Sequence, residues 1–193
     1  DLKFARELGF KIKHLGIARC QNGQLEMAVH PSFVPATAIL SQIDGVQNAV
    51  LVCGDAAGEI LCAGAGAGAG PTGSAVVSDL IDLIQGTSSS GSLGGRSSAP
   101  KALPVRPEAE VVSGYYLRIS MEDQPGVMSA VPSILARRTI SLDKILQEDI
   151  APNRSFIVLV TDPIQHGVIS DAINELQEMT SVIAPVQSIR VFR

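Results

Sequence analysis

The sequence predicts an α/β (α+β) protein made of two domains and a linker, and three observations carry this prediction. The composition changes near residue 86, where apolar residues give way to a run of Ser, Gly and Pro. Before this run, the apolar periodicity follows the order α-β-β-α-β-β-α. After it, the order is β-α-β-β-α-β, which is typical of a ferredoxin-like fold. The expected bounds are residues 1–86 and 114–193 for the domains and 87–113 for the linker.

The first domain contains strand and helix signals of ordinary length. Its expected strands share apolar and β-branched residues bounded by turn signals, and they cover residues 11–18, 25–29, 48–53 and 59–63. Its expected helices have apolar residues at helical spacing, and they cover residues 2–8, 36–43 and 72–84. Asn22 and Gly23 predict a tight hairpin turn. Pro31 is expected to end the strand that follows this turn.

The second domain has the periodicity of strands and helices, whereas the linker has the composition of an irregular segment. The expected strands cover residues 115–120, 139–147, 155–161 and 186–192, and the expected helices cover residues 125–137 and 164–179. Pro125 suits the first turn of a helix, where its missing N–H is not needed. Residues 86–100 have almost nothing apolar to bury, so this part of the linker is expected to be flexible. Pro104 and Pro107 are expected to stiffen the rest.

Composition also limits the classes of function. A net charge of -4 argues against nucleic acid as the main partner. No apolar run approaches the ~20 residues that span a membrane, and no signal peptide opens the chain, so we expect a cytoplasmic protein. The chain starts without Met and is expected to be part of a longer protein. Three cysteines form no CxxC pair and have no histidine at ligand spacing, so we expect reduced, buried thiols and no metal site.

The most conspicuous motif is the glycine-rich stretch of residues 64–72, between an expected strand and an expected helix. Gly64, Gly66 and Ala69 satisfy a G-x-G-x-x-G/A pattern, but no second strand with a following acidic residue comes after the helix, so this is not a Rossmann unit. Two interpretations stay open. The stretch is either a turn in which only small residues fit, or a bare loop that approaches a ligand at a helix N-terminus. Thr72 also suits a helix N-cap.

Several motifs in order make the first domain resemble the C-terminal part of the homoserine dehydrogenase catalytic domain. They are residues 1–9 (DLKFARELG), 11–13 (KIK), 29–31 (VHP), 54–59 (GDAAGE) and 64–80 (GAGAGAGPTGSAVVSDL). The resemblance implies a mixed sheet. It also implies a cytoplasmic oxidoreductase that interconverts L-homoserine and L-aspartate 4-semialdehyde with NAD or NADP, in the biosynthesis of threonine, methionine and isoleucine.

The resemblance also assigns site residues. Gly66, Gly68 and Thr72 match the cofactor-binding turn near the nicotinamide, and Pro71 would help Gly66 to shape it. The family's catalytic lysine and aspartate lie in a Gly-x-Asp-x-x-x-Lys motif that this chain lacks. We therefore expect the catalytic residues upstream of residue 1 and no activity from the chain alone.

The second domain resembles an ACT domain, on residues 115–119 (YYLRI), 123–128 (DQPGVM), 140–142 (ISL) and Gln147. Such domains bind small amino acids, often between subunits, and in this family the implied effector is L-threonine. The implied effector-binding residues are Asp123, Gln124, Gly126, Val127 and Gln147. Gly126 would let the effector carboxylate approach N–H groups at a helix start. The alternatives are a helix start without a ligand and a solvated Gln147.

The resemblance implies a homo-oligomer, dimeric or tetrameric, that threonine regulates through the linker. A different hypothesis is a free-standing amino-acid-binding ACT regulator without catalysis. A third is an oligomerisation module that binds no amino acid.

Overall fold

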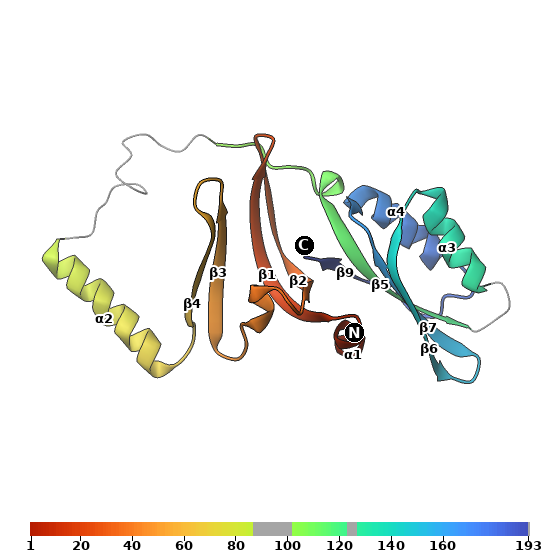
Figure 1. The fold of residues 1–193 in the computed structure, drawn as a ribbon, viewed down its shortest axis with the longest axis horizontal. Coiled ribbons are helices and arrows are strands. Elements are labelled where there is room, and N and C mark those ends of the chain that lie inside the picture. The colour runs from red at the N-terminus through yellow and green to blue at the C-terminus, as the bar shows by residue number, and fades with distance from the viewer. Residues whose placement is uncertain (87–101, 123–126, 193) are drawn as a thin grey trace. The chain divides into compact units, whose positions relative to one another are not determined.

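The computed structural model describes residues 1–86, 102–122 and 127–192 (Figure 1). The chain packs as two compact units. One combines residues 1–37 with residues 103–193, and the other covers residues 38–102. These units differ from the expected division of the sequence, because the first 37 residues pack with the second half of the chain. The bounds 1–86, 87–113 and 114–193 therefore stay a prediction about sequence segments.

A mixed sheet forms the centre of the first unit, in the strand order β1-β2-β9-β5-β7-β6. Its strands are β1 (Phe10–Gln21), β2 (Gln24–Pro35), β5 (Val112–Glu122), β6 (Leu142–Ala151), β7 (Arg154–Thr161) and β9 (Gln187–Val191). The short β8 (Ile164–Gln165) also pairs with β5. The β2–β9 pair is parallel, and the other neighbouring pairs are antiparallel. The mixed α/β class expected from the sequence is confirmed.

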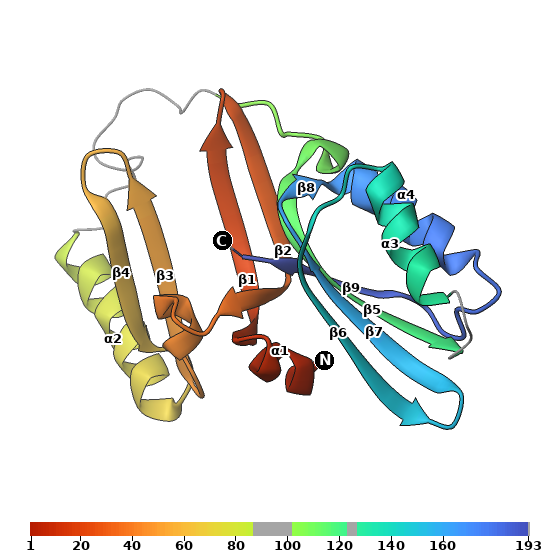
Figure 2. The ribbon, with the colours of Figure 1, turned by 45° about the vertical axis from the view of Figure 1, so that its right-hand side comes forward.

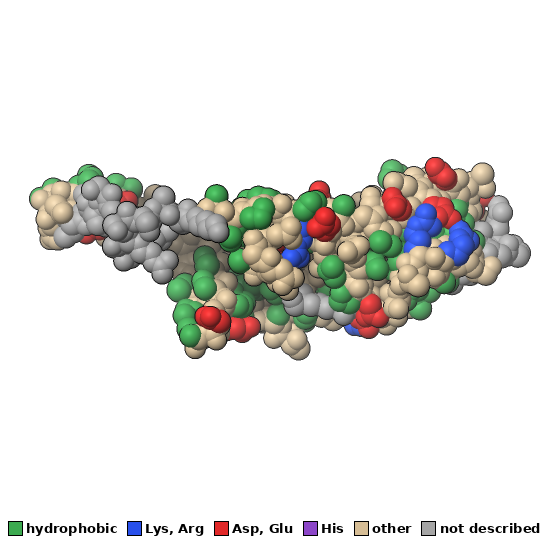
Figure 3. All heavy atoms as spheres, turned by 90° about the horizontal axis from the view of Figure 1, so that it is seen from above, with side chains coloured by type: hydrophobic (Ala, Val, Ile, Leu, Met, Phe, Trp, Pro, Cys, Tyr) green, Lys and Arg blue, Asp and Glu red, His purple; other side chains and the backbone are tan. Residues whose placement is uncertain are grey.

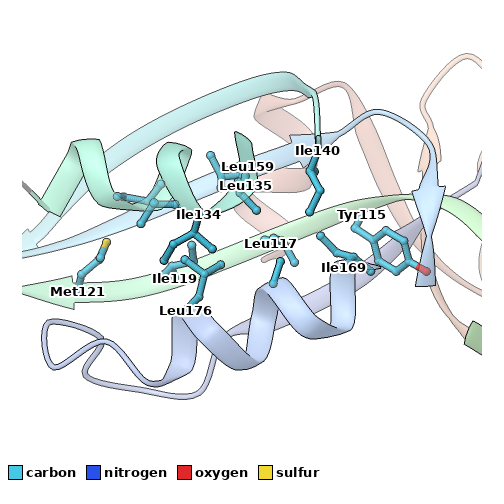
Figure 4. Close-up of a cluster of buried hydrophobic side chains, with 13 residues drawn as sticks. Tyr115, Leu117, Ile119, Met121, Ile134, Leu135, Ile140, Leu159, Ile169 and Leu176 are labelled. Atoms are coloured by element: carbon cyan, nitrogen blue, oxygen red, sulfur yellow. The ribbon is translucent and has the colours of Figure 1, made fainter. Parts of the chain in front are cut away.

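Two helices cover one face of this sheet, namely α3 (Val127–Arg137) and α4 (His166–Gln177) (Figure 2). Between them and the sheet lies a buried apolar core, shown in Figure 4. Alternate residues of β5 reach it, because neighbouring side chains of a strand point to opposite faces. These residues are Tyr115, Leu117, Ile119 and Met121.

The other face of the same sheet is covered by the start of the chain. Phe4 and Ala5 of α1 (Leu2–Glu7) and Phe33 of β2 are buried in one cluster with Tyr116 of β5. The rings of Phe33 and Tyr116 are stacked, with centroids 4.2 Å apart. The β2–β9 pair joins the two parts of the chain at Ser32↔Arg190 and Phe33↔Val191. The hairpin of the first sequence segment thus extends the sheet of the second.

The segment that enters the second half is fixed to this hairpin. Pro104 accepts a hydrogen bond from the backbone N–H of Leu25, and the N–H of Arg106 donates to the carbonyl of Leu25, both at 2.9 Å. A 3-10 turn, η3 (Glu108–Glu110), then leads into β5. The stiffness expected around Pro104 and Pro107 stays a prediction. The flexibility expected of residues 87–101 lies outside the described residues.

The second unit is small and holds little packed interior. It contains η1 (Ile39–Gln42), the two-stranded hairpin of β3 (Gln47–Gly54) and β4 (Gly58–Ala65), and the helix α2 (Ala69–Gln85). None of the residues of α2 is buried, and its apolar side chains Val76, Leu80 and Leu83 are each more than half exposed. An amphipathic helix is normally held by packing of its apolar stripe. The stripe of α2 is available to a surface outside this unit.

Most expected elements are confirmed, but several expectations are wrong. The helix expected over residues 36–43 is only the 3-10 turn η1. Pro31 does not end its strand, because β9 pairs with β2 only at the next two residues and leaves the proline at a free edge. Thr139 has φ +54°, so β6 begins after it. The three cysteines are free but exposed, since each lies on a hairpin face that the unit does not cover.

Candidate functional site

The glycine-rich stretch forms an open turn between β4 and α2. All residues from 64 to 72 are exposed. Gly68 is the N-cap of α2 and has φ +121° and ψ 149°, a conformation that is essentially restricted to glycine. Thr72 is not the N-cap, contrary to one expectation, because its N–H donates to the carbonyl of Gly68 at 3.1 Å, inside the first turn. The helix begins at Ala69, three residues earlier than expected, because Pro71 fits a first turn without its N–H.

Gly66 lies close to an exposed side chain of the same unit. Its N–H donates to the carbonyl of Val46 at 2.9 Å. A Cβ on Gly66 would lie 1.5 Å from Nδ2 of Asn48, so any side chain would displace that amide. By contrast, a Cβ on Gly64 or Gly70 would meet nothing within 4 Å. The contact with Asn48 favours glycine at position 66, and the positive φ favours it at position 68. Neither reason applies to Gly64 and Gly70.

The turn can accept a polar or anionic group from outside. The first N–H groups of a helix have no acceptor within the helix and carry the positive end of its dipole. At α2 these groups belong to small residues, Ala69 and Gly70, whose backbone is exposed. The structure thus brings Gly66, Gly68 and Thr72 together at one open helix start, which is the geometry that the ligand-binding interpretation requires.

The implied effector site is only partly described. Asp123, Gln124 and Gly126 lie outside the described residues. Val127 is the first residue of α3, so the loop does lead into a helix start. Gln147 lies on β6 opposite Ile157 of β7, with an exposed side chain. These five assignments stay predictions.

One polar cluster was not found from the sequence. It lies in the first unit, where Arg190 of β9 meets His30 of β2 and Glu108 of η3, and where Tyr115 meets His166. Its members lie up to 160 residues apart in the sequence, and strand pairing such as that of β2 with β9 and of β5 with β9 brings them together. In the sequence, His30 and His166 lie far apart, and no motif around either one predicts that they share a cluster.

Metal and membrane chemistry have no counterpart in the described part of the chain. Among residues 1–86, 102–122 and 127–192, no three His, Cys, Asp or Glu side chains gather as metal ligands would. Within the same ranges, no helix has both the length and the hydropathy to cross a bilayer. On the face drawn in Figure 3, coloured basic side chains lie beside acidic ones and form no continuous basic patch. Arg137 and Arg138, for example, both bond to the carboxylate of Glu175.

Comparison with known proteins identifies both segments. A family model described as homoserine dehydrogenase matches residues 1–81, and a model described as ACT domain matches residues 115–179. The first segment belongs to the homoserine dehydrogenase family. The homoserine dehydrogenase of Helicobacter pylori is 40% identical over 192 residues, which are 99% of this chain and 45% of that protein. That of Pseudomonas aeruginosa is 39% identical over 198 residues, 99% of this chain and 46% of that protein.

A solved structure agrees with these relatives. The crystal structure of a homoserine dehydrogenase from Thiobacillus denitrificans is 35% identical and has a TM-score of 0.84. The match covers 100% of this chain and 44% of that chain. This chain therefore spans less than half the length of the homoserine dehydrogenases that it matches, and it corresponds to one continuous part that ends in an ACT domain.

Proposed function

We propose that this chain is the C-terminal part of an NAD(P)-dependent homoserine dehydrogenase that interconverts L-homoserine and L-aspartate 4-semialdehyde in the biosynthesis of threonine, methionine and isoleucine. The observation that carries the proposal is the match of 99% of the chain to proteins named for this activity. The catalytic lysine and aspartate would lie in the part of the relatives that this chain does not span. The intact enzyme would be a cytoplasmic homo-oligomer, dimeric or tetrameric.

In this proposal Gly66, Gly68 and Thr72 form the part of the cofactor site that this chain contributes. When bound, the nicotinamide would supply the hydride acceptor or donor. Gly66 and Gly68 hold the turn in a shape that other residues cannot adopt without strain or displacement. The small residues at Gly64 and Gly70, which the unit's own packing does not require, would leave room for a cofactor against bare backbone.

The exposed apolar stripe of α2 also supports a missing neighbour. A contiguous apolar surface on a soluble protein commonly marks an interface. In the proposed enzyme, the cofactor-binding domain would cover Val76, Leu80 and Leu83.

The test compares this 193-residue chain with the longer protein of the same gene. Homoserine-dependent formation of NADPH or NADH is measured by absorbance with both cofactors. We expect activity from the longer protein and none from this chain. Turnover by this chain alone would contradict the placement of the catalytic residues, and an inactive longer protein would contradict the proposed reaction.

We also propose that L-threonine regulates the enzyme through the ACT domain, and that the signal passes through the shared sheet. Three contacts support this route. Phe33 stacks on Tyr116, the Lys144 ammonium donates to the carbonyl of Leu8 at 2.7 Å, and Lys3 pairs with Glu148 at 2.6 Å. A ligand that favours one ACT arrangement would therefore act on the first 37 residues directly, because packed interfaces shift between discrete arrangements.

Cutting the linker tests this route against transmission through the linker. A protease site is inserted within residues 88–100 of the full-length enzyme, and threonine inhibition is measured before and after cleavage. We expect inhibition to persist, because the contacts that join the two segments do not depend on that stretch. Loss of inhibition with the fragments still associated would mean that the linker transmits the signal.

A further inference from the structure

The polar cluster around Arg190 lines a cavity of about 660 Å³ in the first unit. Its walls come from β2, η3, β5, α4 and β9. This volume falls within the range of ordinary small-molecule sites. The cavity is built by segments far apart in the sequence, and two of its charged residues, Glu108 and Arg190, lie outside both segments that match family models. Gln147, one of the described residues to which the ACT resemblance assigns an effector, does not line it.

Two side chains of opposite charge pair in this cavity, and they differ in solvent exposure. Nη2 of Arg190 donates to Oε1 of Glu108 at 2.7 Å. The Arg190 side chain is 12% exposed, whereas that of Glu108 is 72% exposed. The cation is therefore fixed by the sheet, and its carboxylate partner is a side chain of the surface turn η3 that can swing into solvent. Because Arg190 is nearly buried, Glu108 can leave it at little cost only when another carboxylate takes its place.

Further polar groups surround the guanidinium. Nη1 of Arg190 lies 3.5 Å from Nε2 of His30. The hydroxyl of Tyr115 lies 3.0 Å from Nδ1 of His166, whose Nε2 is 3.8 Å from Oε1 of Glu108. Burial raises the pKa of Tyr115, with Arg190 opposing the rise, so the phenol stays protonated at neutral pH. An arginine, two imidazoles, a neutral hydroxyl and one exposed carboxylate thus lie close together in the lining of the cavity.

Most of the remaining lining is apolar, and Glu26, Arg106, Ser170 and Ser188 add polar groups to it. Val111 is buried, and Ile173 and Ile189 are partly buried where they line the cavity. A largely apolar surface beside a pair of opposite charges matches a molecule with a carboxylate and an ammonium bonded to one carbon and with a short side chain. A carboxylate alone would satisfy Arg190 but would be repelled by Glu108. An amine alone would be repelled by Arg190.

We propose that this cavity binds a free α-amino acid with a short, largely apolar side chain. The ligand carboxylate would replace Glu108 on Arg190, a bidentate pairing that guanidinium groups favour. The ligand ammonium would then pair with Glu108. The cavity is lined by β2 and η3 as well as by β5, α4 and β9. A bound ligand would therefore stabilise the packing of the hairpin of the first segment against the ACT sheet. This proposal does not depend on the enzyme activity proposed above.

The test is calorimetry of the 193-residue chain with L-valine and L-threonine. Each is compared with its carboxamide, which lacks the carboxylate, and with its deaminated acid, which lacks the ammonium. We expect the amino acids to bind, and both analogues to bind at least tenfold more weakly. Equal binding of an amino acid and its carboxamide, or no binding of either amino acid, would overturn the proposal.

Variants locate the site. Arg190→Gln and Glu108→Gln should each weaken L-valine binding at least tenfold. Arg138→Gln is the matched control, because Arg138 also pairs with a glutamate but lies outside the cavity lining, and it should bind as the parent does. If Arg190→Gln fails to fold, Glu108→Gln decides, since that exposed side chain can be changed without loss of packing. Unchanged binding in Glu108→Gln would refute the pairing.

A loop variant, Gly126→Val, separates this site from the proposed threonine site. Threonine binding that survives Glu108→Gln but is lost in Gly126→Val would place the effector in the loop between β5 and α3. That result would support the proposed regulation and overturn the cavity site for threonine. Binding lost only in the cavity variants would support the cavity and contradict the loop.

Discussion

Phe33→Ala is the sharpest test of the shared core, because Phe33 belongs to one sequence segment and its stacking partner Tyr116 to the other. Both side chains are fully buried. Removing a buried Phe side chain typically costs about 3–5 kcal/mol. For a unit of about 130 residues, each kcal/mol corresponds to roughly 3–5 °C in Tm, so the melting temperature should fall by roughly 10–20 °C.

The assay must report on the ACT sheet itself. Amide hydrogen exchange of Val158 and Val160 on β7 serves this purpose, because both are buried in the same cluster as Phe33 although they lie on the far side of the linker. We expect their protection to fall with the global stability. Val29→Ala is the control, since Val29 lies on the same strand and is 74% exposed, and it should change the Tm by a few degrees at most.

Unchanged protection of Val158 and Val160 in Phe33→Ala would refute the reasoning. The ACT sheet would then fold independently of the hairpin. The stacked pair would be a contact between two autonomous domains rather than part of one core.

Three further changes test single features. Gly68→Ala should lower the free energy of unfolding of the second unit by about 1–3 kcal/mol in urea titrations followed through α2, because φ is +121° at this residue. Gly70→Ala is the control and should not lower it, since the new methyl group would have open space around it. Equal effects of the two substitutions would contradict the argument from backbone strain. Burial raises the pKa of Tyr116 to about 12, above the value of about 10 in the unfolded chain, so stability should be constant below pH 10 and fall by roughly 2–3 kcal/mol as the pH rises through 12. Tyr116→Phe should lack this fall when unfolding is compared at pH 8 and pH 12, and an identical fall would assign it elsewhere. Thr161→Val removes the buried hydroxyl that accepts the N–H of Tyr115 at 3.0 Å and should cost about 1–3 kcal/mol by thermal melting, whereas a neutral effect would mean that water replaces the hydroxyl.

Local chemistry explains which parts of the fold the sequence could predict. Asn22 and Gly23 both adopt positive φ, as the expected hairpin turn requires. The β-strands of the second domain were recognisable because their buried apolar residues form continuous or alternating runs. The β2–β9 pair was not predicted, because two residues of register separated by more than 150 positions leave no periodic signal.

The candidate sites divide in the same way. The glycine turn could be found from the sequence because glycine often marks a backbone conformation that other residues avoid. Gly68 adopts such a conformation, since its φ is positive. Thr72 was misplaced as a cap because the small residues before it carry no helical periodicity, which concealed the true start at Ala69. The cluster at Arg190 depends on tertiary pairing, and its residues taken singly look like ordinary surface charges.

The two-residue junction between β2 and β9 limits how such a protein can be engineered or can recombine in evolution. A foreign regulatory module joined anywhere in residues 87–101 would arrive without a side chain shaped to receive Phe33 and without a last strand in register with Ser32. Functional chimeras should therefore require co-transfer of the first 37 residues with their matching sheet. Exchange of this module therefore requires that two separate stretches of sequence be transferred together. A single crossover in the linker should give a poorly folded hybrid.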